Sequence, residues 1–305
     1  MLRGAQARSV LSDIIRLKDG TLPLPKVKEQ IERRLSYDQW LKLSHWIEYH
    51  AEDDLRNYWD TKLHFDYTCD PPGSGKNFVI RIPTAPHQVV LGAMTKEIFE
   101  WLKDVRENEE YNHGNETTID IAHNITARNS TRVCLENGDD WEPDQSFKIK
   151  RTGQKKSHPY PAVVIEISYL QRYKNLEHRA ETWIRFSNSN VRTVIGLDLN
   201  DVYKQNQSAT VFVWKSRDGE PELLVKSQFR DESGRAIPDV DLCVSLSDFL
   251  QDDDVQENSR FVDPKMLISS KEIVMALEDG VEDQEIVKRS REEIKSRIEA
   301  QKSNR

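Results

Sequence analysis

Residues 160–169 constrain the fold more than any other segment, because an apolar run that holds one acid fits few places in a protein. The run reads Tyr-Pro-Ala-Val-Val-Ile-Glu-Ile-Ser-Tyr, and its β-branched residues favour an extended strand. Alternate side chains of a strand point to opposite faces, so Val164, Glu166 and Ser168 share one face. A carboxylate in the middle of so apolar a strand needs a partner, because an unpaired buried charge is expensive.

The segments around this strand predict blocks of helix and strand. Apolar residues recur at helical spacing over residues 25–50, 88–106 and 170–186, and residues 1–60 look helical. A C-terminal segment begins at residue 270, is mostly charged from residue 282, and is expected to end in a solvated helix or a tail. Ser36, followed by Gln39 three residues later, matches a capping box at the start of a helix. Residues 107–130 and the acidic triplet 252–254 are expected to be polar loops. Strands are predicted over residues 63–67, 77–82, 131–135, 146–149, 162–169, 193–199, 210–214 and 222–228.

This order of elements predicts an α/β fold, with a mixed central sheet flanked by helices, rather than a sandwich. We expect a helical N-terminal extension over residues 1–60 and a core over residues 61–250. Residues 251–305 are expected to form an acidic loop and a charged C-terminal helix or tail. A chain of 305 residues suits one or two domains, and its 31% of charged residues indicates that part of it is solvated.

Composition also limits the partners and the location. No apolar run approaches the ~20 residues needed to span a bilayer, and no secretory signal is visible, so we expect no membrane contact. Cys69, Cys134 and Cys243 are too few and too far apart for a disulfide framework or a zinc site, which indicates an intracellular location, cytoplasmic or nuclear. The formal charge is -8, so any contact with nucleic acid must come from a local basic patch.

A second acid, Asp144, stands at the head of the strand expected over residues 146–149. A hairpin between Phe147 and Pro161 would bring Asp144 close to Glu166. Two carboxylates, the carbonyl of Ile167 and waters would form an oxygen-rich site suited to Mg²⁺ or Mn²⁺. Such a cation can lower the pKa of a bound water and stabilise charge on a phosphate oxygen. The alternatives are a solvent-facing acid on an edge strand for Glu166 and a turn residue after proline for Asp144.

The densest basic run of the chain lies between the two acids and consists of Lys148, Lys150, Arg151, Lys155 and Lys156. Positive side chains beside a phosphodiester site suit phosphate contact, so nucleic acid is the expected partner. The alternative interpretation is a solvated hairpin tip.

The pattern Pro-Asp-x-Ser-Phe, then Tyr-Pro-x-Val-Val-Ile-Glu-Ile-Ser-Tyr-x-Gln, then an amphipathic helix and Val-Ile-Gly-Leu-Asp, resembles the PD-(D/E)XK (restriction-endonuclease-like) superfamily. It is similar to nuclease-like proteins of fungi and, more distantly, to the Uma2-type endonucleases. The resemblance covers residues 60–230 and implies a metal-dependent phosphodiesterase fold, with Asp144 and Glu166 matching the metal-binding acids. It also implies that Gln171 and Ser168 orient water or backbone. The segment Ile-Arg-Ile-Pro-Thr-Ala-Pro-His is similar to the family's strand-to-helix entry and makes its last residue, His87, a third candidate metal ligand.

Two positions depart from the family's pattern. The lysine of its second motif falls at Ser168, which carries no positive charge, and Lys174 at the start of the next helix is the candidate replacement. Gln88 stands where relatives often place an acid. Three hypotheses follow: a magnesium- or manganese-dependent nuclease-like enzyme, a catalytically inactive relative that binds nucleic acid or protein, and a protein that assembles through its terminal helices.

Overall fold

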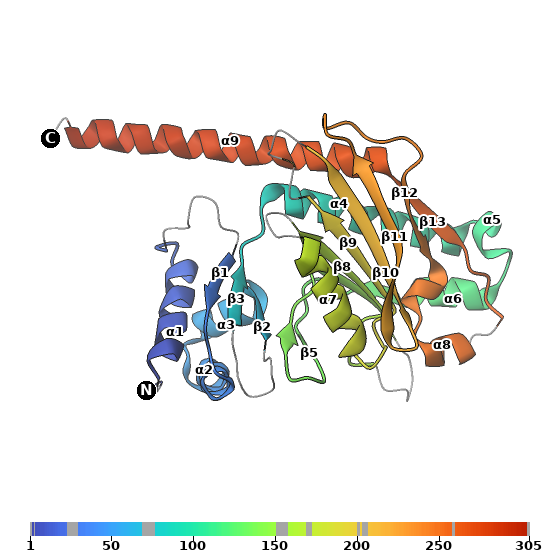
Figure 1. Ribbon diagram of the computed structural model, residues 1–305, viewed down its shortest axis with the longest axis horizontal. Helices are drawn as coiled ribbons and strands as arrows, with labels where there is room; N and C mark the ends of the chain where they lie inside the picture. The colour runs from blue at the N-terminus through green and yellow to red at the C-terminus, as the bar shows by residue number, and fades with distance from the viewer. Residues whose placement is uncertain are drawn as a thin grey trace.

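A computed structural model describes residues 2, 4–22, 30–68, 77–150, 158–168, 173–199, 202, 207–257 and 260–303. These residues form a five-stranded sheet, a six-stranded sheet, a two-stranded sheet and the helices around them (Figure 1). The mixed α/β class expected from the sequence is therefore confirmed. None of the helices that the structure describes is both long enough and apolar enough to cross a membrane.

The six-stranded sheet is the centre of the larger part of the molecule, and its strand order is β11-β10-β9-β8-β7-β4. β8 and β9 are parallel, and every other neighbouring pair in this sheet is antiparallel. Because parallel strands cannot be joined by a tight turn, the chain crosses between β8 and β9 through helix α7. The strands are β4 (Ile125–Ala127), β7 (Gln145–Ile149), β8 (Val163–Ser168), β9 (Thr193–Asp198), β10 (Ala209–Arg217) and β11 (Glu220–Arg230).

The two faces of this sheet pack against different helices. On one face, alternate residues of β8 join the largest core, which α4, α6 and the first turns of α9 cover. On the other face, Val164 packs with Leu176 and Trp183 of α7. The alternation predicted for this strand is confirmed, and Glu166 therefore lies on the face that α7 covers. The helices are α4 (Ala85–Glu107), α6 (Glu116–Asn124), α7 (Tyr173–Arg185) and α9 (Ser270–Ser303).

The N-terminal part of the chain builds a small unit with a core of its own. Its strands belong to the five-stranded sheet, whose order is β1-β3-β2-β6-β5, so the later strands β5 and β6 extend a sheet that the N-terminal strands begin. Trp40 stacks on Tyr67 at a centroid distance of 4.8 Å inside this core. The elements are α1 (Ala5–Lys18), β1 (Gln30–Arg33), α2 (Tyr37–His50), α3 (Asp53–Thr61), β2 (His64–Thr68), β3 (Asn77–Arg81), β5 (Val133–Cys134) and β6 (Asp140–Trp141).

The secondary structure confirms one local expectation from the sequence and corrects two others. The capping box of Ser36 and Gln39 is confirmed at the start of α2. The helical extension expected over residues 1–60 includes a strand, β1, because Ile31 pairs with Ile80 of β3 and this tertiary pairing outweighs the local spacing. The strand expected over residues 131–135 shortens to β5.

Two segments expected to be loops contain regular structure instead. Residues 107–130 hold α5 (Glu109–Asn112), α6 and β4, because the side chains of Asn108 and Asn115 accept hydrogen bonds from backbone N–H groups and cap the two helices. The acidic triplet opens α8 (Asp252–Glu257). The remaining elements are β12 (Asp241–Ser245), η1 (Leu246–Phe249) and β13 (Lys265–Ser269), and β12 pairs with β13.

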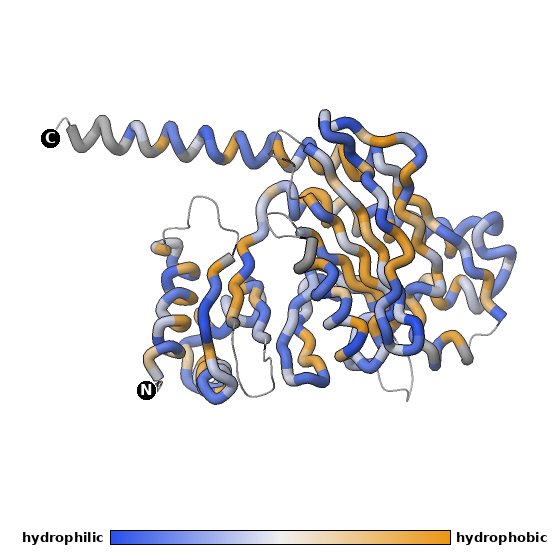
Figure 2. The backbone as a smooth tube through the Cα atoms, viewed as in Figure 1, coloured by the Kyte–Doolittle hydropathy of each residue, from blue (hydrophilic) through white to orange (hydrophobic). Residues whose placement is uncertain are grey.

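The C-terminal segment, for which the sequence left a helix or a tail open, forms helix α9, and this helix has two parts with different surroundings. Its first turns pack against α4 so closely that a Cβ atom added at Gly280 would lie 2.5 Å from Cα of Pro86. The Gln284 side chain then accepts a hydrogen bond from the backbone N–H of Ala85 at 3.2 Å. Beyond this point the helix runs out past the body of the protein (Figure 1), and most of the residues that are coloured there in Figure 2 are hydrophilic.

Candidate functional site

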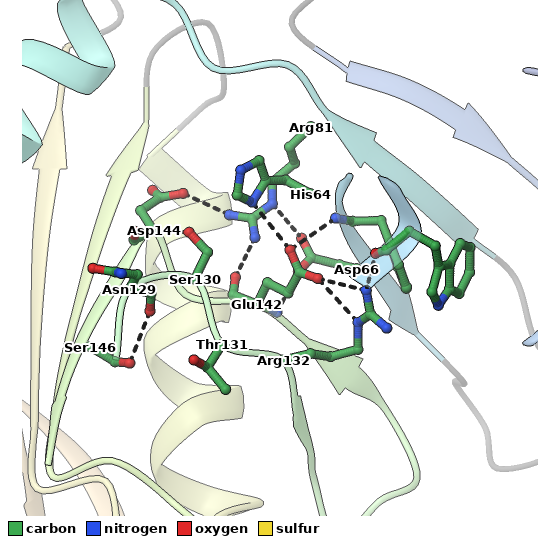
Figure 3. Close-up of polar contacts among 12 residues, drawn as sticks. His64, Asp66, Arg81, Asn129, Ser130, Thr131, Arg132, Glu142, Asp144 and Ser146 are labelled. Atoms are coloured by element: carbon green, nitrogen blue, oxygen red, sulfur yellow. Dashed lines mark hydrogen bonds and ion pairs between the residues drawn. The ribbon is translucent and has the colours of Figure 1, made fainter. Parts of the chain in front are cut away.

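The two predicted acids lie in a buried network of charged side chains between the small unit and the central sheet. Asp66 comes from β2, Arg81 from β3, and Glu166 from β8. Asp144 lies directly before β7, and Arg179 lies on α7. Figure 3 shows Arg81 placed between Asp144 and Asp66, so the network joins parts of the chain that are far apart in sequence.

Both oxygens of the Asp144 carboxylate accept hydrogen bonds. Oδ1 accepts one from Nη1 of Arg81 at 2.7 Å, and Oδ2 accepts one from the backbone N–H of Ile167 at 2.7 Å. Nε2 of His87 lies 3.1 Å from the same Oδ2. The bond to Ile167 shows how the hairpin of β7 and β8 sets Asp144 against the middle of β8, as predicted.

The Glu166 carboxylate is held by α7. Oε1 accepts hydrogen bonds from Nε1 of Trp183 at 2.5 Å and from Nη2 of Arg179 at 2.8 Å. Oε2 lies 2.8 Å from Nε of Arg179, so the guanidinium group faces both carboxylate oxygens. Nε of Arg179 makes no hydrogen bond with a described residue, so its contact with Oε2 is an attraction of opposite charges beside the one hydrogen bond from Nη2.

The same two arginines also bind the small unit. Nη1 of Arg179 donates to Oδ2 of Asp66 at 2.8 Å, and its Nη2 donates to the backbone carbonyl of Glu142 at 2.9 Å. Arg81 Nε lies 3.4 Å from the same Asp66 oxygen, and Arg81 also donates to the Glu142 carbonyl. Each guanidinium therefore connects an acid of the small unit with an acid of the central sheet.

Glu142 forms the outer part of this network. Its Oε1 accepts hydrogen bonds from Nε and Nη2 of Arg132 at 3.1 and 3.0 Å. Nδ1 of His64 lies 3.4 Å from Oε2, and the guanidinium of Arg132 also lies over the ring of Phe65 at 3.8 Å. Four buried acids are thus matched by three arginines, and the network is close to neutral without any added ion. The acids are Asp66, Glu142, Asp144 and Glu166, and the arginines are Arg81, Arg132 and Arg179.

A cleft of about 50 Å³ opens onto this network. Asp144, Glu166 and His87 all line it, together with His64, Arg81 and Arg179. A volume of this size holds a few water molecules, since one water needs roughly 10–15 Å³ on the same measure. The convergence of the two acids on one small polar space, predicted from the sequence, is present in the structure.

The two acids of the cleft titrate differently. Burial raises the pKa of Glu166 to about 7, and repulsion from Asp144 adds to the rise, although Arg179 opposes it. Burial alone would raise the pKa of Asp144 as well, but attraction to His87 and Arg81 holds it below its ordinary value. Burial alone would lower the pKa of Arg179, but the carboxylates of Asp66 and Glu166 raise it above its ordinary value. The cleft therefore contains one firmly ionised carboxylate and one that titrates close to neutral pH.

The donor set does not fit a divalent cation held by Asp144 and Glu166 in this arrangement. Three of the four carboxylate oxygens of the pair accept a hydrogen bond from an N–H group. The fourth, Oε2 of Glu166, lies 2.8 Å from Nε of Arg179, which presents its positive charge where a cation would have to bind. Among the described residues, no group of three or more histidines, cysteines, aspartates or glutamates could hold a metal ion. A cation could bind the two acids only after Arg179 had moved away.

The other sequence candidates lie in several places. Ser168 is buried at the end of β8, and the backbone of Lys174 lies in the first turn of α7. The side chain of Lys174 lies outside the described residues, as do Arg151, Lys155, Lys156, Gln171 and Cys69. The described structure therefore tests none of the roles that the sequence suggested for these six residues.

The expectation that the basic run lies beside the acids is wrong for its described part. Phe147 of β7 pairs with Val163, so Lys148 and Lys150 continue past the start of β8, away from Glu166. Six residues of strand separate Asp144 from Lys150, which corresponds to roughly 20 Å. The cations beside the acids are instead Arg81 of β3 and Arg179 of α7.

Sequence reasoning missed Asp66, Arg81, Glu142 and Arg179 as members of the site. One signal was present for Arg179, because it lies between Leu176 and Trp183 on the apolar face of α7. A charged residue on an otherwise apolar helix face indicates a buried partner in the same way as Glu166 does on its strand.

A scan against protein-family models and a search of the curated proteins both find no match to this chain. The resemblance to the PD-(D/E)XK superfamily therefore stays a prediction.

The raised pKa of Glu166 gives a prediction for stability. Because this pKa rises from 4.5 to about 7 on folding, the folded state binds the proton more tightly. The free energy of unfolding should be highest below the unfolded pKa and should decline by about 3 kcal/mol as the pH rises towards 7. Urea unfolding between about pH 5 and pH 8 should show this decline in the wild type and not in Glu166→Gln. An equal change of the free energy of unfolding with pH in the two proteins would contradict the raised pKa of Glu166.

Proposed function

We propose that this chain is a PD-(D/E)XK-like protein that binds nucleic-acid phosphodiesters without hydrolysing them. The observation that carries this proposal is the contact of Arg179 with both carboxylate oxygens of Glu166, at 2.8 Å each. It gives the acid pair a permanent positive partner from the chain itself. The free cysteines Cys134 and Cys243 accord with a reducing intracellular compartment, cytoplasmic or nuclear.

Hydrolysis of a phosphodiester would require two features at this site. Metal-assisted hydrolysis needs carboxylate oxygens that are free to bind the cation, and it needs positive charge beside the attacking water. Here the carboxylates are engaged by Arg81 and Arg179, and Ser168 carries no charge at the position of the family's lysine. Removing one partner from a buried ion pair leaves an uncompensated charge, so these arginines and acids are needed together in the folded state.

Binding is assigned to the basic run at the end of the β7–β8 hairpin. Lys150, which is described and exposed, lies directly after β7 and away from the acidic cleft. In a chain with a formal charge of -8, this run is the densest basic segment of the sequence and therefore suits a phosphate backbone. Phosphate contact and the acid network are then separate features of the protein.

Metal-dependent hydrolysis is the second candidate, and one observation favours it. Asp144, Glu166 and His87 line the same small cleft, and the two acids differ in pKa in the way that a general acid and a general base differ. This candidate requires Arg179 to leave Glu166 when the cation and the substrate arrive.

A cleavage and binding assay separates the two candidates. We expect labelled single-stranded DNA, double-stranded DNA or RNA to be bound equally with EDTA and with Mg²⁺ or Mn²⁺, and to remain uncut. Lys150→Glu should weaken binding, because a phosphate contact is replaced by repulsion. Lys265→Glu is the matched control, since Lys265 is also exposed but lies on β13.

Cleavage that requires a cation and disappears in both Asp144→Asn and Glu166→Gln would establish the second candidate instead. Loss of binding on chelation, without cleavage, would contradict the first, because the acid pair would then hold a cation needed for the contact.

A further inference from the structure

The first turn of helix α4 begins without a cap of its own. The side chain of its N-cap residue, Thr84, does not cap the turn, and Oγ1 of Thr84 is buried without a hydrogen-bond partner among the described residues. The first N–H groups of a helix have no partner inside the helix, so such a start needs an acceptor from elsewhere. Gln284 of α9 supplies one, since its Oε1 accepts a hydrogen bond from the backbone N–H of Ala85 at 3.2 Å.

The same turn lies directly against the backbone of α9, whose first part runs along α4 (Figure 1). A Cβ atom added at Gly280 would lie 2.5 Å from Cα of Pro86, 3.0 Å from its backbone nitrogen and 3.2 Å from the carbonyl oxygen of Ala85. All three atoms belong to the backbone, so no rotation of a side chain would make room for it. The close approach of the two helices therefore requires glycine at this position.

His87 stands on this turn and lines the cleft. Its ring is buried, and its Nε2 lies 3.1 Å from Oδ2 of Asp144. Successive residues of a helix are rotated by about 100°, so a turn that presents Pro86 to α9 presents His87 to a different side. A movement of the turn relative to α9 would carry the imidazole with it.

Asp144 is held independently of the turn. Its carboxylate accepts hydrogen bonds from Nη1 of Arg81 and from the backbone N–H of Ile167, both at 2.7 Å. The other ring nitrogen of His87, Nδ1, lies 3.4 Å from Nε2 of Gln88, which belongs to the same turn of α4. If the turn moved, the acid would stay in place and the histidine would leave it.

We infer that Gln284 and Gly280 are positioning residues of the cleft, and that they hold the ring of His87 against Asp144 through the first turn of α4. Neither residue lines the cleft, so both act through the turn. Gln284 lies 199 residues from its hydrogen-bond partner, which makes the C-terminal helix a part of the site. This role goes beyond the proposed function, because it is the same whether or not the cleft takes a cation.

The test is the rate at which diethyl pyrocarbonate modifies each histidine of the full chain, measured by peptide mass spectrometry at a single pH. Gln284→Met removes the acceptor but keeps the length of the side chain. It should raise the rate at His87 at least about fivefold, because the turn then opens more readily. Gln284→Glu keeps an acceptor and should retain the wild-type rate. His64 is the internal control, since it lines the same cleft but lies on β2, and its rate should not change.

A second pair of variants tests the close approach of the two helices. Gly280→Ala adds the Cβ atom that meets Pro86 and should also speed the modification of His87. Gly92→Ala is the matched control, because Gly92 lies on α4 itself and a Cβ atom there meets no described neighbour within 4 Å. Should Gly280→Ala not fold, the two Gln284 variants decide alone.

An unchanged rate at His87 in Gln284→Met would overturn the inference. An equal rise at His87 and His64 would overturn it as well, because it would indicate a general loosening of the fold rather than a movement of one turn. If Gln284→Glu behaves like Gln284→Met, the acceptor is not what holds the turn, and the role assigned to Gln284 is wrong.

Discussion

Replacing Arg179 with alanine is expected to lower the free energy of unfolding by about 3–5 kcal/mol, because it leaves the buried Glu166 without a guanidinium partner and Asp66 with Arg81 alone. Asp66 and Glu166 both accept hydrogen bonds from this side chain, and both are buried. Urea unfolding at neutral pH measures the loss. Arg217→Ala is the matched control, since Arg217 is 73% exposed in its ion pair with Glu222 and should cost less than about 1 kcal/mol.

The same variant tests the relation between Arg179 and a divalent cation. With the guanidinium removed, the carboxylate of Glu166 becomes available to a cation, which binds only the folded state and so stabilises it. We expect MnCl₂ at about 1 mM to raise the melting temperature of Arg179→Ala and to leave the wild type unchanged. If the single variant does not fold, Arg179→Met with Glu166→Gln removes both charges and should fold without any response to Mn²⁺. A wild type that responds as strongly as Arg179→Ala would show that Arg179 does not occupy the place of a cation.

The sequence predicted the central sheet well, because local periodicity carries that information. The run around Glu166 alternates between two apolar faces, and both faces are buried in the structure. The following helix and strand were found for the same reason, and so was the convergence of Asp144 on Glu166 through a hairpin. In each case a short pattern determines which face a side chain takes.

The partners of the acids could not be predicted in this way. Asp66 and Arg179 bind each other across a separation of 113 residues, and such a pair leaves no local pattern. The expected basic partner was the run after Asp144, which is adjacent in sequence. The antiparallel pairing of β7 with β8 carries Lys148 and Lys150 away from the acids as the strand extends. Nearness along the chain was therefore a poor guide to nearness in space.

Replacing Asp66 with alanine is expected to be the second most damaging substitution. Its Oδ2 faces both Arg81 and Arg179, and its Oδ1 accepts the backbone N–H of Glu142 at 3.1 Å. Removing this carboxylate leaves two buried guanidinium groups underpaired, at an expected loss of about 3–4 kcal/mol. Asp38→Ala is the control, because Asp38 is 72% exposed in its ion pair with Lys42.

Which strands Asp66→Ala loosens is more informative than how much it lowers the free energy of unfolding. Asp66 belongs to the small unit, which has its own core, and the arginines that it binds also hold Asp144 and Glu166. Hydrogen exchange of Asp66→Ala should therefore show faster exchange in β2 and β3 and also around Glu166 in β8, because the network couples both parts. Faster exchange in the small unit alone would mean that β8 holds its acid independently, and the site would then belong to the central sheet. Faster exchange in the small unit and in β8 would make the small unit a component of the site. The positions of Asp144 and Glu166 would then depend on it.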